Sequence, residues 1–223
     1  MTPLIAREGY PFIAGALVLA IALYGLSSVL PSSLVTAARA VAVVSLLFAL
    51  FCTWFFRDPE RTATADSSSL LSPADGTVID IREVQEPLYL KTTVKRVSIF
   101  MSVFSVHVNR APMKGMLDFV HYHPGKFISA FKEKASLDNE SMFIGIKDQA
   151  SSRAIAVKLI AGLIARRIVM YKKAPDELQR GERIGMIRFG SRAEIYCPLS
   201  AEIMVKKGDA VTAGETVVGI LKE

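Results

Sequence analysis

Two long apolar segments near the N-terminus constrain this chain more than any other feature of its sequence. Residues 11–30 carry no charge, and residues 34–56 carry one, Arg39. A helix needs about 20 apolar residues to cross the hydrocarbon core of a bilayer, so each segment is long enough. A Pro-Ser-Ser turn at 31–33 separates them and can cap the second helix. We therefore expect residues 1–56 to form a membrane hairpin of two apolar helices.

Basic residues predict the orientation of this hairpin. Arg7 precedes the first segment, Arg57 and Arg61 follow the second, and the turn carries no charge. Because excess positive charge stays cytoplasmic, both ends and the rest of the chain are expected on the cytoplasmic side of the cell (plasma) membrane. Trp54–Phe56 predicts an aromatic belt. A hairpin that lies in the membrane plane remains an alternative. The first segment could also be a cleaved signal peptide, but the long second apolar segment that follows it argues against this.

The net charge of the chain limits the kinds of molecule that it is expected to bind. The 223 residues include 27 Lys and Arg against 21 Asp and Glu, a net charge of +6, and 51% of them are hydrophobic. This composition excludes a disordered chain, and the two cysteines provide no disulfide framework. A basic protein attracts either nucleic acid or an anionic membrane surface. Next to a membrane hairpin, the membrane surface is the expected partner, and no nucleic acid is expected.

The remainder of the chain is predicted to be mainly β. A polar linker is expected at 57–69 and a β domain at 70–223, because many short apolar runs with Gly turns favour a barrel or a sandwich. Only Ile155–Lys173 also admits a helix. The predicted strands are Gly76–Glu83, Val94–Val108, Gly115–His121, Met142–Ile146, Ile155–Ile160, Arg183–Phe189, Ala193–Tyr196, Ile203–Val205 and Thr216–Leu221.

The two ends of this β domain resemble each other. The segment 72–78 is similar to 197–203, and the tail 205–215 resembles the biotinyl/lipoyl hammerhead, in which two glycine turns follow an apolar strand. Gly208 and Gly214 are expected at positive φ, which these chain reversals require. The predicted fold class is therefore a mainly β barrel or sandwich with hammerhead-like, duplicated halves, preceded by N-terminal transmembrane helices.

Few side chains in this sequence suit catalysis by themselves. Histidine occurs three times, at His107, His121 and His123, and no GxSxG, HExxH or phosphate-binding glycine loop is present. His121 and His123 would share one face of a strand, as in some zinc sites, but no further ligand completes the set unless His107 joins from another strand. We expect these two histidines to be hydrogen-bonded surface residues and predict no metal.

Six motifs together resemble a known family. In their order and spacing they are similar to the short, membrane-bound form of the phosphatidylserine decarboxylase proenzyme family, over residues 54–223. The matching motifs are Trp54–Arg61, Ser72–Val78, Ile99–Pro112, Pro124–Phe127, Ala130–Glu140 and Gly185–Arg192.

The resemblance implies that the chain cleaves itself between Gly190 and Ser191. The products 1–190 and 191–223 would remain together as a heterodimer, with a higher oligomer left open. Ser191 would become a pyruvoyl group, a covalent cofactor whose ketone forms a Schiff base with the substrate amine and withdraws electrons as CO2 leaves. The implied reaction converts phosphatidylserine, a membrane phospholipid, into phosphatidylethanolamine.

The same resemblance implies roles for other residues. His107 would accept the Ser191 proton, and Asp75 would orient the imidazole as in a hydrolase triad. Arg110 stands where longer relatives have a second histidine, so either His107 alone serves both proton-transfer roles or Arg110 binds the substrate phosphate or carboxylate. Asn139 and Lys126 are further substrate-binding candidates, and Ser141 stands where arginine is expected.

Two interpretations without decarboxylation remain open at this stage. A membrane-anchored, lipoyl-like adaptor or transport-fusion subunit would keep its chain intact and bind a partner protein. The sequence lacks the modified-lysine turn of a carrier domain, which argues against a carrier role. A zinc peptidase built from duplicated barrels would contain stoichiometric zinc.

Overall fold

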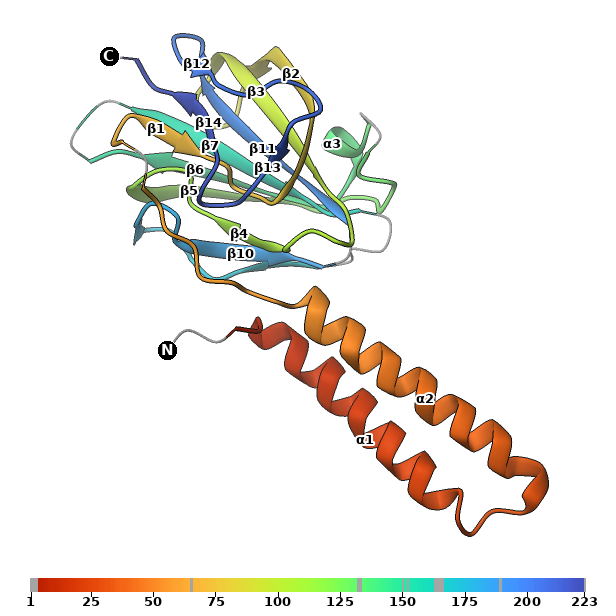
Figure 1. The fold of residues 1–223 in the computed structure, drawn as a ribbon. Helices are drawn as coiled ribbons and strands as arrows, with labels where there is room; N and C mark the ends of the chain where they lie inside the picture. Colours follow the sequence, from red (N-terminus) through yellow and green to blue (C-terminus); the bar gives the residue numbers. More distant parts are fainter. Residues whose placement is uncertain are drawn as a thin grey trace. The chain divides into compact units, whose positions relative to one another are not determined.

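The computed structural model describes residues 4–64, 66–131, 134–149, 151, 153–162, 167–188 and 190–222. The chain forms two compact units, Met1–Glu60 and Arg61–Glu223. The first is a pair of helices and the second is built almost entirely of β-strands (Figure 1).

The first unit is a hairpin of two antiparallel helices. A short 3-10 turn, η1 (Arg7–Gly9), leads into α1 (Tyr10–Leu26), and α2 (Ser32–Phe55) returns beside it. By length and composition, both helices suffice to cross a membrane, with mean hydropathies of 1.8 for Arg7–Leu26 and 2.3 for Ser32–Phe55. The two predicted apolar helices are therefore confirmed, and they are compatible with membrane association.

Small residues line the contact between the two helices. Ala16 and Ala20 of α1 are buried, as are Ala38, Ala42 and Ala49 of α2. Small side chains allow two helix backbones to approach closely, which is how helices gain packing energy inside lipid. Larger apolar side chains of both helices are exposed on the outer surface of the unit, where lipid would cover them.

The aromatic residues at the end of α2 divide into buried and exposed groups. Phe55 and Phe56 are fully buried, and Phe12 stacks on Phe56 with ring centroids 5.6 Å apart. Trp54 is 41% exposed, and the Arg57 guanidinium lies 4.2 Å from its ring centroid. The predicted aromatic belt is thus wrong for the two phenylalanines, because they pack inside the hairpin.

The second unit contains three antiparallel sheets. The largest has the strand order β13-β2-β3-β11-β7-β6-β5-β9, and the small sheets have the orders β1-β14-β12 and β4-β10-β8. A short helix, α3 (Ala135–Asp138), precedes β6. The strands are β1 (Ser69–Leu71), β2 (Gly76–Glu86), β3 (Thr92–Met101), β4 (Val108–Arg110), β5 (Gly115–His123), β6 (Ser141–Lys147), β7 (Ala154–Ile160), β8 (Ile168–Met170), β9 (Asp176–Leu178), β10 (Arg183–Ile187), β11 (Ser191–Pro198), β12 (Glu202–Ile203), β13 (Ala210–Val211) and β14 (Val217–Ile220).

Alternation along β3 and β11 places the main core on one face of the large sheet. Val97, Ile99 and Met101 of β3 belong to this core, together with Ala193 and Ile195 of β11. Successive side chains of a strand point to opposite faces, so the intervening residues lie on the other face. Ser191 pairs with Met101 in this register and therefore falls on the core face, at the first position of β11.

Most predicted strands are present, with two differences. The predicted strand Val94–Val108 is divided, because β3 ends at Met101 and a turn at 102–105 leads the chain to β4 in another sheet. The helical alternative for Ile155–Lys173 is wrong, since Ala154–Ile160 and Ile168–Met170 are strands. Phe189, at the end of the predicted strand Arg183–Phe189, lies outside the described residues.

The glycine turns have the predicted conformation. The φ angles are +98° at Gly208 and +73° at Gly214, a region that glycine enters without steric cost. The mainly β class with two N-terminal helices is confirmed, while the hammerhead-like duplication stays a prediction. Arg61, within the predicted linker 57–69, packs on the β unit with only 12% of its side chain exposed.

Candidate active site

Ser191 is buried at the junction between an irregular segment and the central strand β11. Its side chain is inaccessible to solvent, and its Oγ donates to the Met101 sulfur at 3.2 Å. A thioether sulfur is a weak acceptor, so this bond holds the hydroxyl only loosely. Gly190, immediately before it, has φ of +68°, a conformation that glycine adopts without steric cost.

His107 lies in the connection between β3 and β4 and is fully buried. Its Nδ1 is 2.9 Å from the Ser105 carbonyl oxygen, and its Nε2 is 3.3 Å from the Gly190 backbone nitrogen. A carbonyl can only accept, so we assign the ring hydrogen to Nδ1. Nε2 then carries the lone pair and accepts from the Gly190 N–H. The basic nitrogen is therefore directed at the residue preceding Ser191.

Asp75 lies in the turn before β2 and is held by two other groups. Its Oδ1 accepts from the Ala213 N–H at 2.8 Å, and its Oδ2 lies 3.0 Å from the Arg61 guanidinium. The carboxylate side chain is 17% exposed. The His107 ring nitrogen that a triad would give to Asp75 is instead hydrogen-bonded to the Ser105 carbonyl. The structure thus places Asp75 with Arg61, and its role toward the imidazole stays a prediction.

The three substrate-binding candidates occupy different environments. Arg110 is buried and donates to the Gly181 carbonyl at 2.8 Å. Asn139 is fully buried, and its amide bonds the Ile128 backbone on both sides and the Ala161 carbonyl at 2.7 Å. Lys126 is exposed, 3.7 Å from the Asp138 carboxylate. Among these, only Lys126 presents its charge to solvent.

Ser141 is buried at the start of β6, where the family resemblance led us to expect arginine. Among the residues that the structure describes, none hydrogen-bonds to its Oγ. The absence of a guanidinium here leaves a small hydroxyl beside Ile160 on β7, its register partner.

A buried charge network on the opposite face of β11 was missed by sequence reasoning. Arg192 and Glu194 form an ion pair at 2.9 Å, and Tyr196 donates to the same carboxylate. Burial lowers the pKa of Lys158, which lies near Glu194, and the negative charge partly offsets that effect. The sequence signal that could have revealed this network is the alternation of polar residues at 192, 194 and 196. The network also includes Arg96, Asp80, Ser98 and Ser136.

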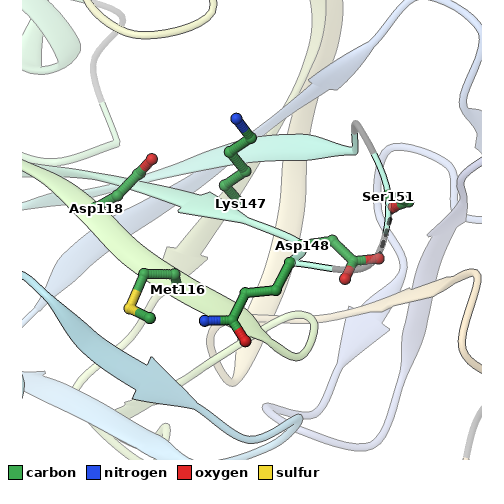
Figure 2. A pocket seen from close by; sticks show the side chains of 6 residues that line it. Met116, Asp118, Lys147, Asp148 and Ser151 are labelled. Atoms are coloured by element: carbon green, nitrogen blue, oxygen red, sulfur yellow. Dashed lines mark hydrogen bonds between the residues drawn. The ribbon is translucent and has the colours of Figure 1, made fainter.

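One cavity in the described part of the β unit is not lined by Ser191. It has a volume of about 670 Å³ and is lined by Met116, Asp118, Lys147, Asp148, Gln149 and Ser151. Figure 2 shows these side chains around the ends of two strands, with Ser151 hydrogen-bonded to Asp148 at 2.6 Å. It contains neither a histidine nor a nucleophile suited to the chemistry at residue 191.

The described residues contain no group of three or more side chains placed to hold a metal ion. His121 and His123 are exposed on β5, and His107 is buried in the β3–β4 connection. Their separation gives the zinc peptidase hypothesis no geometric support in this part of the chain.

Comparison with known proteins identifies close relatives. A family model described as phosphatidylserine decarboxylase matches residues 48–219. A phosphatidylserine decarboxylase proenzyme of Symbiobacterium thermophilum is 41% identical over 99% of this chain and 97% of its own length. Proteins of the same name are 44% identical in Magnetococcus marinus, over 98% and 96%, and 49% identical in Carboxydothermus hydrogenoformans, over 81% and 84%.

Proposed function

The chain belongs to the phosphatidylserine decarboxylase family, and from that premise we propose that it cleaves itself between Gly190 and Ser191 to create its own cofactor. It is a proenzyme that decarboxylates phosphatidylserine to phosphatidylethanolamine in phospholipid synthesis. The observation that carries the proposed cleavage is the lone pair of His107 Nε2 directed at Gly190, beside a buried serine.

The proposed cleavage begins with attack of Ser191 Oγ on the Gly190 carbonyl carbon. The peptide C–N bond breaks and an ester forms, while the Oγ proton passes through His107 to the Ser191 nitrogen. β-Elimination then releases the Gly190 carboxylate and leaves a dehydroalanine at residue 191. Its hydrolysis consumes one water, releases ammonia and gives a pyruvoyl group. This sequence balances without an external cofactor, oxidant or metal.

The residues around Ser191 fit such a group. Residue 191 is the first residue of β11, so a pyruvoyl group there would leave the pairing of Arg192–Pro198 with β3 and of Arg192–Tyr196 with β7 in place. Ser191, His107 and Met101 are all buried, so the group would lie within the protein rather than on its surface. The pyruvoyl ketone supplies an electron sink for the electron pair released with CO2. In the mature site, His107 would hold or move protons near the reacting carbon.

The two products are proposed to remain associated as a heterodimer. The downstream product 191–223 contains β11, which pairs with β3 and β7, β13, which pairs with β2, and β14, which pairs with β1. Removing this product would leave the backbone groups of β3 and β7 without their hydrogen-bonding strand β11. Because unpaired backbone groups are costly, these hydrogen bonds oppose dissociation. Substrate contacts of Arg110, Asn139 and Lys126 remain part of this proposal.

The two apolar helices support a membrane location. We place them across the plasma membrane, with the β unit on the cytoplasmic side, because Arg7 and Arg57 flank the helix ends that lie away from the turn. A chain with a net charge of +6 is attracted to an anionic bilayer surface, where the substrate headgroup lies. Glycine turns at 208 and 214 support the hammerhead-like fold proposed for the tail.

Denaturing gels with intact-mass measurement test the cleavage. The wild type is expected as two fragments divided after residue 190, and Ser191→Ala as one intact chain. His107→Ala is expected to slow cleavage about 100-fold or more, the usual contribution of a positioned base. His121→Ala, at an exposed strand position, is the matched control. Identical intact bands for wild type and Ser191→Ala would contradict self-cleavage and favour the adaptor hypothesis.

Borohydride reduction tests the cofactor. It converts a ketone to an alcohol, so treated enzyme should lose decarboxylase activity and gain two mass units on the downstream fragment. Full activity after complete reduction of that fragment would rule out an essential ketone.

A further inference from the structure

Gly162 lies against the carbonyl oxygen of the residue at which cleavage is proposed. A Cβ atom on Gly162 would fall closer than 3.0 Å to the Gly190 oxygen and 3.0 Å from its carbonyl carbon. One Cα hydrogen of Gly162 therefore points at this oxygen, in the direction that a side chain would take. No residue larger than glycine fits beside the carbonyl in its observed position.

The residue before Gly162 is held by hydrogen bonds at both its N–H and its carbonyl group. The preceding Ala161 N–H donates to the Glu140 carbonyl at 2.9 Å, and the Ala161 carbonyl accepts from Asn139 Nδ2 at 2.7 Å. Asn139 is fully buried, and its hydrogen bonds to the Ile128 backbone fix the orientation of its amide. The peptide group that leads into Gly162 is consequently anchored next to the Gly190 oxygen.

Residue 190 is thus restrained at both of its peptide groups. Its N–H donates to His107 Nε2 at 3.3 Å, and its carbonyl oxygen contacts Gly162. The contact with Gly162 limits rotation of the Gly190 carbonyl plane about ψ. Attack on a carbonyl requires approach to one face of that plane, and correct placement of reacting atoms contributes strongly to the rate.

We propose that Gly162 is a positioning residue for self-cleavage, supported by Asn139. It orients the Gly190 carbonyl so that Ser191 Oγ reaches its carbon. This inference rests on the proposed cleavage at this bond. It adds that Gly162 controls one step of that cleavage, the formation of the ester. Asn139, a substrate-binding candidate from the sequence, acts here by fixing the Ala161–Gly162 backbone.

The direct test is Gly162→Ala in the full-length chain, with Gly115→Ala as the matched control. A Cβ on Gly115 would also press on backbone, 2.6 Å from the Lys147 oxygen, but on β5. We expect Gly162→Ala to slow cleavage about 100-fold, the cost of a small displacement of reacting groups. Gly115→Ala should be cleaved at nearly the wild-type rate. Equal cleavage rates in these two variants would overturn the proposal.

Two further measurements separate positioning from loss of fold. In a Ser191→Ala background, where no chain is cleaved, Gly162→Ala and Gly115→Ala should unfold at similar temperatures. Hydroxylamine attacks esters, so a precursor blocked before ester formation should resist it. Gly162→Ala precursor that hydroxylamine splits at residue 190 would place the block after the ester and refute the assigned step.

A second variant decides the matter if Gly162→Ala does not fold. Asn139→Asp keeps the size of the side chain but replaces the Nδ2 donor to Ala161 with an acceptor. Folded Asn139→Asp is expected to cleave slowly and to resist hydroxylamine. Wild-type cleavage by this variant would contradict the support assigned to Asn139 and, with it, the proposal. Cleavage of Ser191→Ala would instead overturn the proposed function itself.

Discussion

At the scale of single residues, the site depends on what each ring nitrogen of His107 bonds. The Ser105 carbonyl fixes the hydrogen on Nδ1, which leaves Nε2 as the base beside Gly190. A backbone carbonyl thus orients the ring and sets its tautomer, a task that a hydrolase triad gives to a carboxylate. The negative charge of Asp75 is compensated by Arg61 and the Ala213 N–H.

Replacing Asp75 with asparagine tests whether its charge matters for cleavage. Asp75→Asn preserves the shape but removes the ion pair with Arg61, so the turn before β2 loses a partly buried anchor. We expect cleavage to slow about tenfold, the effect of raising the activation barrier by about 1.4 kcal/mol. Time courses on denaturing gels provide the measurement. Glu215→Gln removes the more exposed partner of Arg61 and is expected to have little effect.

At the scale of elements, β11 joins two environments. Its core face carries Ser191, while its opposite face carries Arg192, Glu194 and Tyr196. A carboxylate buried between guanidinium groups is costly to lose, because its partners then remain as uncompensated charges. The strand that presents the reactive residue is therefore held by charge on one side and by apolar packing on the other.

Removing the Glu194 charge should destabilise the fold strongly. Glu194 is fully buried and pairs with Arg192, so Glu194→Gln is expected to lower the free energy of unfolding by about 3–5 kcal/mol. Urea unfolding in the uncleaved Ser191→Ala background measures this. Glu202→Gln breaks the exposed pair with Lys222 and should cost about 0–1 kcal/mol. Equal losses of unfolding free energy in both variants would show that the buried network contributes no more to stability than an exposed ion pair does.

Alkaline pH should weaken the same strand. Burial raises the pKa of the Cys197 thiol from 9.0 to about 11, and burial beside Glu194 raises the pKa of Tyr196. Folding therefore favours the protonated forms, and their contribution to stability is complete below pH 9.0. It is lost as the pH rises through about 11. Unfolding curves at several pH values should show this fall, and Cys197→Ala should make it shallower.

At the scale of the whole molecule, the chain consists of a helical unit and a β unit that differ in how much apolar surface they expose. The helices expose large apolar side chains around a seam of alanines, whereas the β unit has a large apolar core of its own. Every residue proposed for cleavage belongs to the β unit, Arg61–Glu223. The helices are therefore expected to serve access to the lipid substrate rather than the cleavage chemistry.

Deleting the helical unit tests this division. A chain that begins at residue 57 should remain in the soluble fraction and still cleave itself after residue 190. With substrate in anionic vesicles its activity should fall well below that of the full chain, and detergent-dispersed substrate should narrow the gap. Flotation with vesicles, gels and product assays provide the three readouts. A truncated chain that floats with vesicles as the full chain does would contradict the anchoring role.

The sequence by itself determined the local structure and the family. Apolar length predicted both helices, short apolar runs with glycine turns predicted most strands, and Gly208 and Gly214 have the positive φ expected of them. These features depend on residues close together in the chain, so a local pattern records them. The order and spacing of the motifs similarly identified the decarboxylase family without coordinates.

Only the tertiary structure decided which distant groups meet at residue 191. Nothing local reveals that the Gly190 N–H reaches His107, that Gly162 touches the Gly190 carbonyl, or that Asp75 faces Arg61. The crossing from β3 to β4, which breaks the long apolar run at 94–108, likewise follows from sheet pairing. Such contacts depend on the register between strands far apart in the chain, and a shift of one residue would reverse the face of every side chain.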